Sequence, residues 1–312
     1  MRGLPEAIDH LLAVEFRPDG YRDGVIEPLW RAARERVGGA LAWTAATRLL
    51  AAAAAGGTVL IATGVVDPEL MPSGETDGPP GAAVLARAVA QATPARVVVL
   101  TEAAGLGPVR AALLALRVPE TVTASAFPLE AAAAEVVAER LLRDATAVIA
   151  VEKVGPGRDA RHRTATGKDV DAQSAPAAIL FAGGQRRGLL TVGVGDLGNE
   201  LGLGDLAATT ARVLPQGALI ACTVGSDVPV VAACSNWGAY GIVAALAARC
   251  RLPDLMPDAA EDRAVLTAVT SAGATDSAAG RPAMAVDGLP AAVHAAFADL
   301  LCGVVTFALS RR

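Results

Sequence analysis

The chain has 312 residues, a formal net charge of −5 and 53% hydrophobic residues, of which few are aromatic. These values predict a folded globular protein with a substantial core and with helices packed through small side chains. The mild acidity, without a Lys/Arg block, argues against nucleic acid as a partner and favours a small-molecule ligand.

The first 55 residues are predicted to form helices that precede a sheet, with a loop marked by Pro18, Gly20 and Gly24. Acidic residues interrupt the first 15 positions, which excludes an ordinary signal peptide. The segment is therefore expected to be part of the folded protein.

Six short runs, aliphatic on both faces, are predicted as strands. They are Thr58 to Thr63, Arg96 to Thr101, Thr121 to Ala126, Ala147 to Val151, Leu189 to Val194 and Ala218 to Val224. The helix-length segments between and after them are Gly81 to Ala92, Pro108 to Leu116, Leu129 to Arg143, Ala172 to Ala182, Leu206 to Leu214 and Ser235 to Arg249. This alternation predicts an α/β fold with a mainly parallel sheet flanked by helices, in a Rossmann-like three-layer arrangement. Functional loops of such a fold collect at the carboxyl ends of the strands.

The region from Asp258 onward is predicted to be helical again, ending in Leu289 to Leu309 with Gly303 as a weak position. No uninterrupted apolar run reaches the ~18 residues that a membrane-spanning helix needs, so no membrane partner is expected. We predict a single α/β domain, composed of a helical segment (1–55), a sheet core (56–250) and a second helical segment (251–312). A homo-oligomer remains open.

Cysteine and histidine usage indicates no zinc or disulfide chemistry. The four cysteines lack C-x-x-C spacing and lie among apolar neighbours, so we interpret them as buried reduced thiols, consistent with a cytoplasmic protein. The three histidines are far apart, and none is near a cysteine pair.

Polar residues follow the first strand. The strand ends in Thr63-Gly64, and a Gly/Pro-rich loop downstream carries Glu75 and Asp77 and enters the next helix at Gly78. Two acids in such a loop could hold a cation or an ammonium group. The alternative is that Asp77 only caps the helix that follows it, which has proline in its first turn.

Glu152 stands at the carboxyl end of the fourth strand, where a buried acid is costly unless it meets a cation or hydrogen-bond donors. It is therefore a site candidate, with an ion pair to Lys153 or Arg158 as the alternative. The long polar loop after it (156–169), which contains Asp159, could be a mobile cover over the site or a solvated surface excursion.

The stretch after the fifth strand, TVGVGDLGNELGLGD (191–205), has the Gly-x-Gly-x-x-Gly spacing of a dinucleotide loop. An ionised Asp196 inside it would repel a pyrophosphate, which argues against NAD or FAD. Asp196, Asn199 and Glu200 on a tight glycine turn instead offer oxygen ligands that suit Mg²⁺ or Mn²⁺. The alternative is that these are turn residues, and we interpret Asp205 as a cap of the next helix.

The last of these helices opens with Ser235 and Asn236. A helix N-terminus with such residues is suited to bind a carboxylate or a phosphate. Trp237 and Tyr240, which follow, are interpreted as core residues, with ligand contact as the alternative.

Together these motifs resemble the C-terminal domain of D-glutamate cyclase, a domain that also occurs as a stand-alone protein. The matching motifs are T-G at 63–64, E-T-D-G-P-P-G-A at 75–82, Glu152 followed by G…D…G-x-D, G-x-G-D-x-G-N-E-x-G-x-G at 193–204 and S-N-W-G-x-Y at 235–240. They span the chain from about Gly57 to Arg249.

The resemblance implies an α/β fold, a divalent cation (Mn²⁺ or Mg²⁺) held by acids in an internal cavity, and lactam formation from D-glutamate to 5-oxo-D-proline. On this basis the substrate would be a small molecule, an amino acid. The predicted metal ligands are Glu152, Asp196 and Asn199; the predicted catalytic residues are Glu75, Asp77 and Glu200; the predicted substrate-binding residues are Thr63, Gly64, Gly78, Asp159, Ser235 and Asn236.

The chain departs from the family pattern in two places. Leu197 and Leu203 stand where the family commonly has Gly and Met, and the stretch 159–167 lacks the Tyr, Asn and Arg positions of the family's loop. The second departure concerns the substrate more than the fold or the metal. The separate N-terminal domain of full-length D-glutamate cyclase has no counterpart in this sequence, and activity could depend on it.

Two other functions fit the same residues. Carboxylate-bound metal beside a helix N-terminus would also suit a Mg²⁺/Mn²⁺-dependent hydrolase of phosphate esters. A non-catalytic metabolite-binding module would use the cavity without forming a product.

Overall fold

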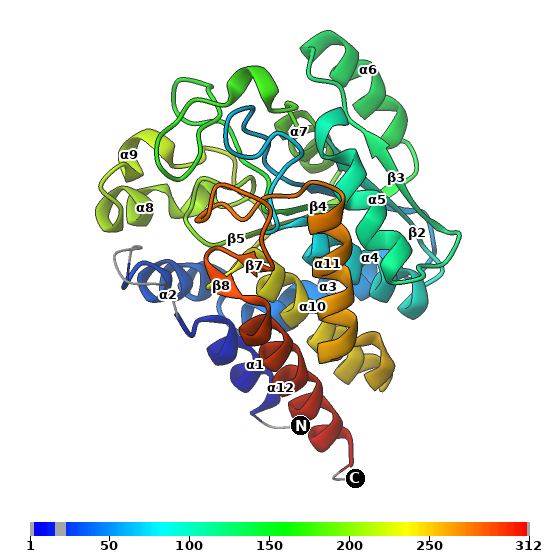
Figure 1. The fold of residues 1–312 in the computed structure, drawn as a ribbon. Helices are drawn as coiled ribbons and strands as arrows, with labels where there is room; N and C mark the ends of the chain where they lie inside the picture. Colours follow the sequence, from blue (N-terminus) through cyan, green and yellow to red (C-terminus); the bar gives the residue numbers. More distant parts are fainter. Residues whose placement is uncertain (1–2, 16–22, 311–312) are drawn as a thin grey trace.

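The structure is a computed structural model that describes residues 3–15 and 23–310. Of the predicted N-terminal loop, Pro18 and Gly20 lie outside the described residues. The core is a parallel sheet in the order β3-β2-β1-β4-β5-β6 (Figure 1). Its strands are β1 Thr58–Thr63, β2 Arg96–Thr101, β3 Val122–Ala126, β4 Ala145–Val151, β5 Leu190–Gly195 and β6 Val228–Val231. This strand order places a topological switch between β1 and β4, where ligands bind in open parallel sheets.

Twelve α-helices are present among the described residues. They are α1 Leu4–Leu12, α2 Ile26–Val37, α3 Leu41–Ala53, α4 Pro79–Ala92, α5 Leu106–Ala115, α6 Ala131–Leu141, α7 Ala178–Arg186, α8 Ala207–Val213, α9 Gly217–Ile220, α10 Ser235–Cys250, α11 Ala259–Ser271 and α12 Ala291–Ser310. A short hairpin of β7 Ala285–Val286 and β8 Leu289–Pro290 precedes α12.

The sheet is buried on both faces, as its aliphatic strands predict. Along β1, Val59 and Ile61 join the larger core with α3, α4 and α10, whereas Leu60 and Ala62 join the smaller core with α6 and α7. Successive side chains of a strand point to opposite faces, which produces this division. The predicted three-layer α/β fold with a mainly parallel sheet is confirmed.

One predicted strand is wrong. The run Ala218–Val224 begins in the short helix α9, and the sixth strand is instead the segment Val228–Val231. A short aliphatic run cannot be assigned to helix or strand from periodicity alone. Pro229 lies within β6, and it is tolerated there because β6 is at the edge of the sheet, where a residue without an N–H does not interrupt the pairing.

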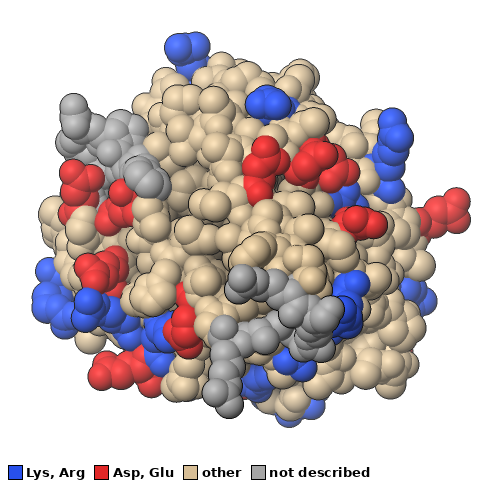
Figure 2. Space-filling model, turned by 90° about the horizontal axis from the view of Figure 1, so that it is seen from below, with Lys and Arg blue, Asp and Glu red and all other residues tan. Residues whose placement is uncertain are grey.

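The C-terminal helix α12 is long and apolar enough to cross a membrane by length and composition alone. In the structure, however, 33% of its most apolar 18-residue window is buried, and it packs against α10 and α11. Phe297 of α12 stacks on Trp237 of α10 with ring centroids 3.9 Å apart. Figure 2 views the end of the molecule where α1 and α12 lie, and uncharged atoms predominate on it, with charged side chains scattered among them.

Candidate functional site

A cavity of about 90 Å³ lies at the carboxyl ends of β1, β4 and β5, beside the topological switch. A cavity needs about 10–15 Å³ of solvent-accessible volume to hold one water molecule, so this cavity has room for several waters or a small metabolite. Its lining comprises Val65, Asp67, Leu70, Met71, Glu75, Glu152, Val154, Thr164, Ala165, Thr166, Asp196, Leu197, Asn199, Ser277 and Asp287. Five of these residues carry carboxyl groups, and none of the described lining residues is Lys, Arg or His.

Glu152 occupies a strained backbone position at the end of β4. Its φ is 45°, a left-handed value that non-glycine residues seldom adopt, and its side chain is buried. Its carbonyl accepts the Gly64 N–H at 2.9 Å, its own N–H donates to the Val194 carbonyl at 3.1 Å, and Ser235 Oγ donates to its Oε2 at 2.5 Å. The strands on both sides thus fix the direction of this carboxylate.

The predicted alternative, an ion pair of Glu152 with Lys153, does not form. The Lys153 ammonium instead pairs with Glu102, and it donates to the Gly64 carbonyl at 3.0 Å. Both members of the pair are buried, with 1% and 2% of their side chains exposed. Glu102 escaped the sequence analysis, although it directly follows β2 in the same way that Glu152 follows β4.

The glycine-rich loop after β5 is organised by one carboxylate. Glu200 Oε1 accepts the N–H groups of Asp196 and Leu197 at 3.0 and 2.9 Å, and its Oε2 accepts that of Gly198 at 2.7 Å. A Cβ atom on Gly195 would lie 2.6 Å from Glu200 Cδ. The glycine spacing therefore serves a tight turn around a buried carboxylate, and no phosphate is needed to explain it.

Three carboxylates meet at this turn. Glu152, Asp196 and Glu200 each offer an oxygen, and these oxygens lie within 4.8 Å of one another. Burial is the largest cause that raises the pKa of Glu152 well above its usual range, and the charges of Glu200 and Asp196 add to it. Burial and the charge of Asp196 raise the pKa of Glu200 to about 8. A bound cation would offset the repulsion that these acids share.

Asn199, the third predicted ligand, also lines the cavity. Its Nδ2 donates to the Arg163 carbonyl at 3.1 Å, while its Oδ1 is buried without a hydrogen-bond partner among the described residues. A buried amide oxygen without a partner is costly unless a ligand meets it. Carboxylate and amide oxygens are the ligands that Mg²⁺ and Mn²⁺ prefer, so these residues fit such an ion.

Glu75 reaches the cavity from the loop before α4. It lies beside Thr275 in an isolated bridge, and its Oε1 is buried without a hydrogen-bond partner among the described residues. Burial, then the charges of Asp287 and Asp77, raise its pKa well above the usual range. Glu75 is therefore placed, as predicted, among the acids at the strand ends.

Asp77 caps a helix, but not the one that the alternative reading predicted. Its carboxylate accepts the N–H groups of Ser235 and Asn236 at 2.9 and 2.8 Å, which begin α10. In return, Asn236 Oδ1 accepts the N–H groups of Gly78 and Gly81 at 3.0 and 2.7 Å, which begin α4. Asp77, Ser235 and Asn236 lie behind the cavity and not in its lining.

Of the remaining predicted substrate-binding residues, three lie next to the cavity and one lies on the surface. Thr63, Gly64 and Gly78 sit beside Glu152 without lining the cavity; a Cβ on Gly78 would lie 2.8 Å from both Glu152 Cβ and Thr63 Oγ1. These residues let α4 approach the strand ends closely. Asp159 is not brought to the cluster, because it lies half-exposed on the surface and pairs with Arg163 at 2.6 Å.

The loop after β4 contributes to the wall of the cavity, which agrees with the predicted cover, whereas its mobility stays a prediction. Thr164, Ala165 and Thr166 line the cavity, and Lys168 ties the loop down by pairing with Asp67 at 2.6 Å. The predicted cap at Asp205 is wrong: no side chain caps α8, and Asp205 lies 3.4 Å from Arg36 in an exposed pair.

Sequence reasoning missed Ser277 and Asp287, which line the cavity from the segment between α11 and α12. That segment was predicted to be helical, but it contains the β7–β8 hairpin. The signal was present, because Asp-Gly between short aliphatic runs is typical of a tight hairpin turn, and Asp287-Gly288 occupies that turn.

A family model described as D-glutamate cyclase-like, C-terminal, matches residues 28–302. The chain belongs to this D-glutamate cyclase-like family. Human mitochondrial D-glutamate cyclase is 35% identical over 100 residues, which is 32% of this chain. The match covers 16% of the length of that human protein. The resemblance inferred from the motifs is confirmed, and the matched family region contains every strand of the sheet and every residue of the cavity lining.

Proposed function

We propose that the protein is a metal-dependent cyclase that forms a lactam from glutamate or a related amino acid with loss of water. The observation that carries the proposal is the charge of the cavity. It is lined by five carboxyl groups and, among the described residues, by no cationic side chain. An acidic substrate could enter such a cavity only together with a cation.

Glu152, Asp196 and Glu200, with Asn199 Oδ1, would hold an Mn²⁺ or Mg²⁺ ion. When bound, the ion would polarise the side-chain carboxylate of the substrate and stabilise the oxyanion that develops on it. Glu200 also closes the turn through its three backbone hydrogen bonds, so its contribution includes holding Asp196 in place.

Glu75 is the residue we propose to take the proton from the substrate's ammonium group, because only the free amine is nucleophilic. Its unpartnered Oε1 and its raised pKa support this role. Asp77 is less suited, since its oxygens already accept the N–H groups at the start of α10. The C–N bond forms as one C–O bond of the carboxylate breaks, and the nitrogen gives up two protons in all, the first to Glu75 and the second after its attack. Both protons leave with the departing carboxylate oxygen as water, which balances the reaction.

The substrate's other carboxylate needs hydrogen-bond donors. The sequence suggested Ser235 and Asn236, but their N–H groups donate to Asp77. Thr164 and Thr166 line the cavity, and their hydroxyl groups, 2.9 Å apart, are better placed donors. This loop is the part of the chain that departs from the family pattern, so a substrate other than D-glutamate fits the proposal equally.

The deciding experiment combines metal analysis of the purified protein with mass spectrometry for loss of water from candidate amino acids. Asp196→Ala should lose both bound metal and turnover. Asp205→Ala is the matched control, because it removes an acid from the same glycine-rich loop at a position outside the cavity. Unchanged metal content and turnover in Asp196→Ala would refute the mechanism.

The alternative of a phosphate-ester hydrolase loses part of its support. It relied on a helix N-terminus free to bind phosphate, and Asp77 occupies the first N–H groups of α10. Phosphate release from sugar and nucleoside phosphates would still test it. A non-catalytic binding module predicts thermal stabilisation by an amino acid without any product.

A further inference from the structure

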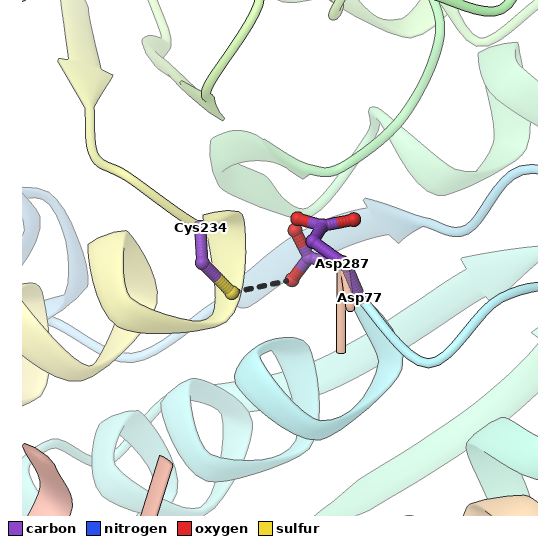
Figure 3. A group of neighbouring side chains, drawn as sticks. All are labelled: Asp77, Cys234 and Asp287. Atoms are coloured by element: carbon purple, nitrogen blue, oxygen red, sulfur yellow. Dashed lines mark hydrogen bonds between the residues drawn. The ribbon is translucent and has the colours of Figure 1, made fainter. Parts of the chain in front are cut away.

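One part of the cavity wall carries acids that the metal cluster does not include. Asp287 and Ser277 line the cavity together with Glu75, and Ser277 Oγ donates to Asp287 Oδ1 at 2.9 Å. Behind them, Asp287 lies beside Asp77 and Cys234, which offer ligand atoms within 4.8 Å of its own (Figure 3). The carboxyl groups of Glu75, Asp77 and Asp287 thus form a second acidic group, apart from Glu152, Asp196 and Glu200.

Asp77 and Cys234 have partners within the protein. Asp77 accepts hydrogen bonds at the start of α10, which compensates its charge. The Cys234 thiol donates a hydrogen bond to Asp77 Oδ1 at 3.3 Å. Burial raises the pKa of this thiol well above its usual range. Cys234 therefore serves as a thiol donor to Asp77.

Glu75 lacks such compensation. Only 6% of the residue is exposed, and its Oε1 has no hydrogen-bond partner among the described residues. Asp287 is the charge that acts on it most strongly, so the two carboxyl groups are neighbours. A buried carboxylate oxygen without a hydrogen-bond donor calls for a donor or a cation from a ligand, and the half-buried Asp287 carboxylate lies beside it on the cavity wall.

We propose that Glu75, Asp287 and Ser277 form a subsite for the primary ammonium group of an amino acid ligand, separate from the metal cluster. The inference rests on the proposed function, which it deepens by assigning the two ends of the substrate to different acids. An ammonium group has three donors, and Glu75 Oε1, the Asp287 carboxylate and Ser277 Oγ offer acceptors for them. The amine is thereby placed next to the residue that takes its proton. A Mg²⁺ ion would need near-octahedral coordination, for which this group offers fewer oxygens.

The test compares ligands with and without an amine on the wild-type protein and on a variant of the subsite. Their affinities are measured by calorimetric titration of the metal-loaded protein. The probes are D-glutamate, L-glutamate and glutarate, which has both carboxylates but no amine. The wild-type protein should bind one glutamate enantiomer more tightly than glutarate by roughly tenfold to a hundredfold, as for a hydrogen bond to a charged group. Asp287→Asn should lose most of this preference and bind glutarate at least as tightly as the wild-type protein.

Glutarate binding shows in the same titration that the variant is folded and holds its metal. Glu69→Gln is the matched control, because Glu69 lies at the rim with 79% of its side chain exposed, paired with Lys168. It removes one negative charge near the cavity without touching the lining, and it should keep the full preference for glutamate. Ser277→Ala is a second variant that should weaken the preference less than Asp287→Asn does.

The proposal is overturned if the wild-type protein binds glutarate as tightly as both glutamate enantiomers, if none of the three probes binds, or if Asp287→Asn keeps the preference. Failure of the cyclase activity is a separate result. If glutamate is bound with a preference that depends on Asp287 but loses no water, the subsite stands and the proposed reaction falls.

Discussion

Asp77 and Asn236 cap each other's helices. Asp77 precedes α4 and accepts the first N–H groups of α10, whereas Asn236 begins α10 and accepts the Gly78 and Gly81 N–H groups at the start of α4. Two helices distant in sequence are thus locked at the point where the chain passes the cavity. Substitution of either residue should therefore affect stability first.

Asn236→Ala should lower the free energy of unfolding by about 2–4 kcal/mol, because it leaves the buried Gly81 N–H without its acceptor and the Thr76 carbonyl without its donor. Chemical denaturation measures the change. Glu130→Ala is the control: Glu130 caps α6 on the exposed surface through Ala132 and Ala133, so its loss should lower the stability much less. Equal losses in the two variants would contradict the role of the buried pair of caps.

Gly195→Ala should weaken the metal affinity. The added Cβ would lie 2.6 Å from Glu200 Cδ, and Glu200 cannot move without breaking its bonds to three N–H groups of the turn. We expect a loss of stability of about 1–3 kcal/mol together with weaker Mn²⁺ binding in calorimetric titration. Mn²⁺ affinity equal to that of the wild type would show that the turn does not position the ligands.

Gly303→Ala is the matched substitution outside the site. No heavy atom lies within 4 Å of the added Cβ, and Gly303 lies exposed within α12. Alanine should stabilise the helix by about 0.5–1 kcal/mol and leave metal binding unchanged. A destabilised Gly303→Ala protein would indicate that this face of α12 is covered by a partner in solution.

The sequence predicted the first five strands and the site loops because both depend on local patterns. Acids after parallel strands converge at one edge of the sheet, which is why Glu152 and Asp196 could be assigned to one metal site before their distances were known. Glu200, which was predicted as a catalytic residue, joins them in the structure. The wrong sixth strand had no such support, since a short aliphatic run fits a helix as well as a strand.

Contacts between distant segments could not be predicted in this way. Asp287 reaches the cavity only because the segment before α12 folds back beside Glu75. The Glu102–Lys153 pair forms because β2 and β4, which these residues follow, lie on either side of β1. The partner of each cap also follows from tertiary placement, since Asp77 sits directly before one helix and caps another.

Lys153→Met should be severely destabilising, because it leaves Glu102 buried without its cation; a loss of about 3–5 kcal/mol is typical. The double variant Lys153→Met, Glu102→Met should recover much of this stability, since an apolar pair can replace a buried ion pair. Thermal and chemical unfolding of the three variants measures the coupling. If the double variant is as unstable as the sum of the single variants, the two residues are not coupled.

Asp262 supplies a pH dependence that can be isolated from the site. It accepts a hydrogen bond from the Tyr240 hydroxyl at 2.8 Å, while its Oδ2 is buried without a hydrogen-bond partner among the described residues. Burial raises its pKa from 3.8 to about 6; Tyr240 and Arg263 act in the opposite direction, and Asp299 adds to the rise. A raised pKa means that the folded protein binds this proton more tightly than the unfolded chain does. Stability from this group is therefore present below about pH 4 and is lost as the pH rises through 6.

Asp262→Asn should remove that loss, because the amide keeps an acceptor for Tyr240 and never ionises. Relative to the wild-type protein, the variant should gain stability between pH 4 and pH 7, by up to about 3 kcal/mol for a shift of this size. Urea denaturation of both proteins at several pH values measures the difference between their free energies of unfolding. The other buried acids contribute equally to both proteins, so their contributions cancel in this difference. A difference that stays constant across this range would show that Asp262 ionises normally in the folded state.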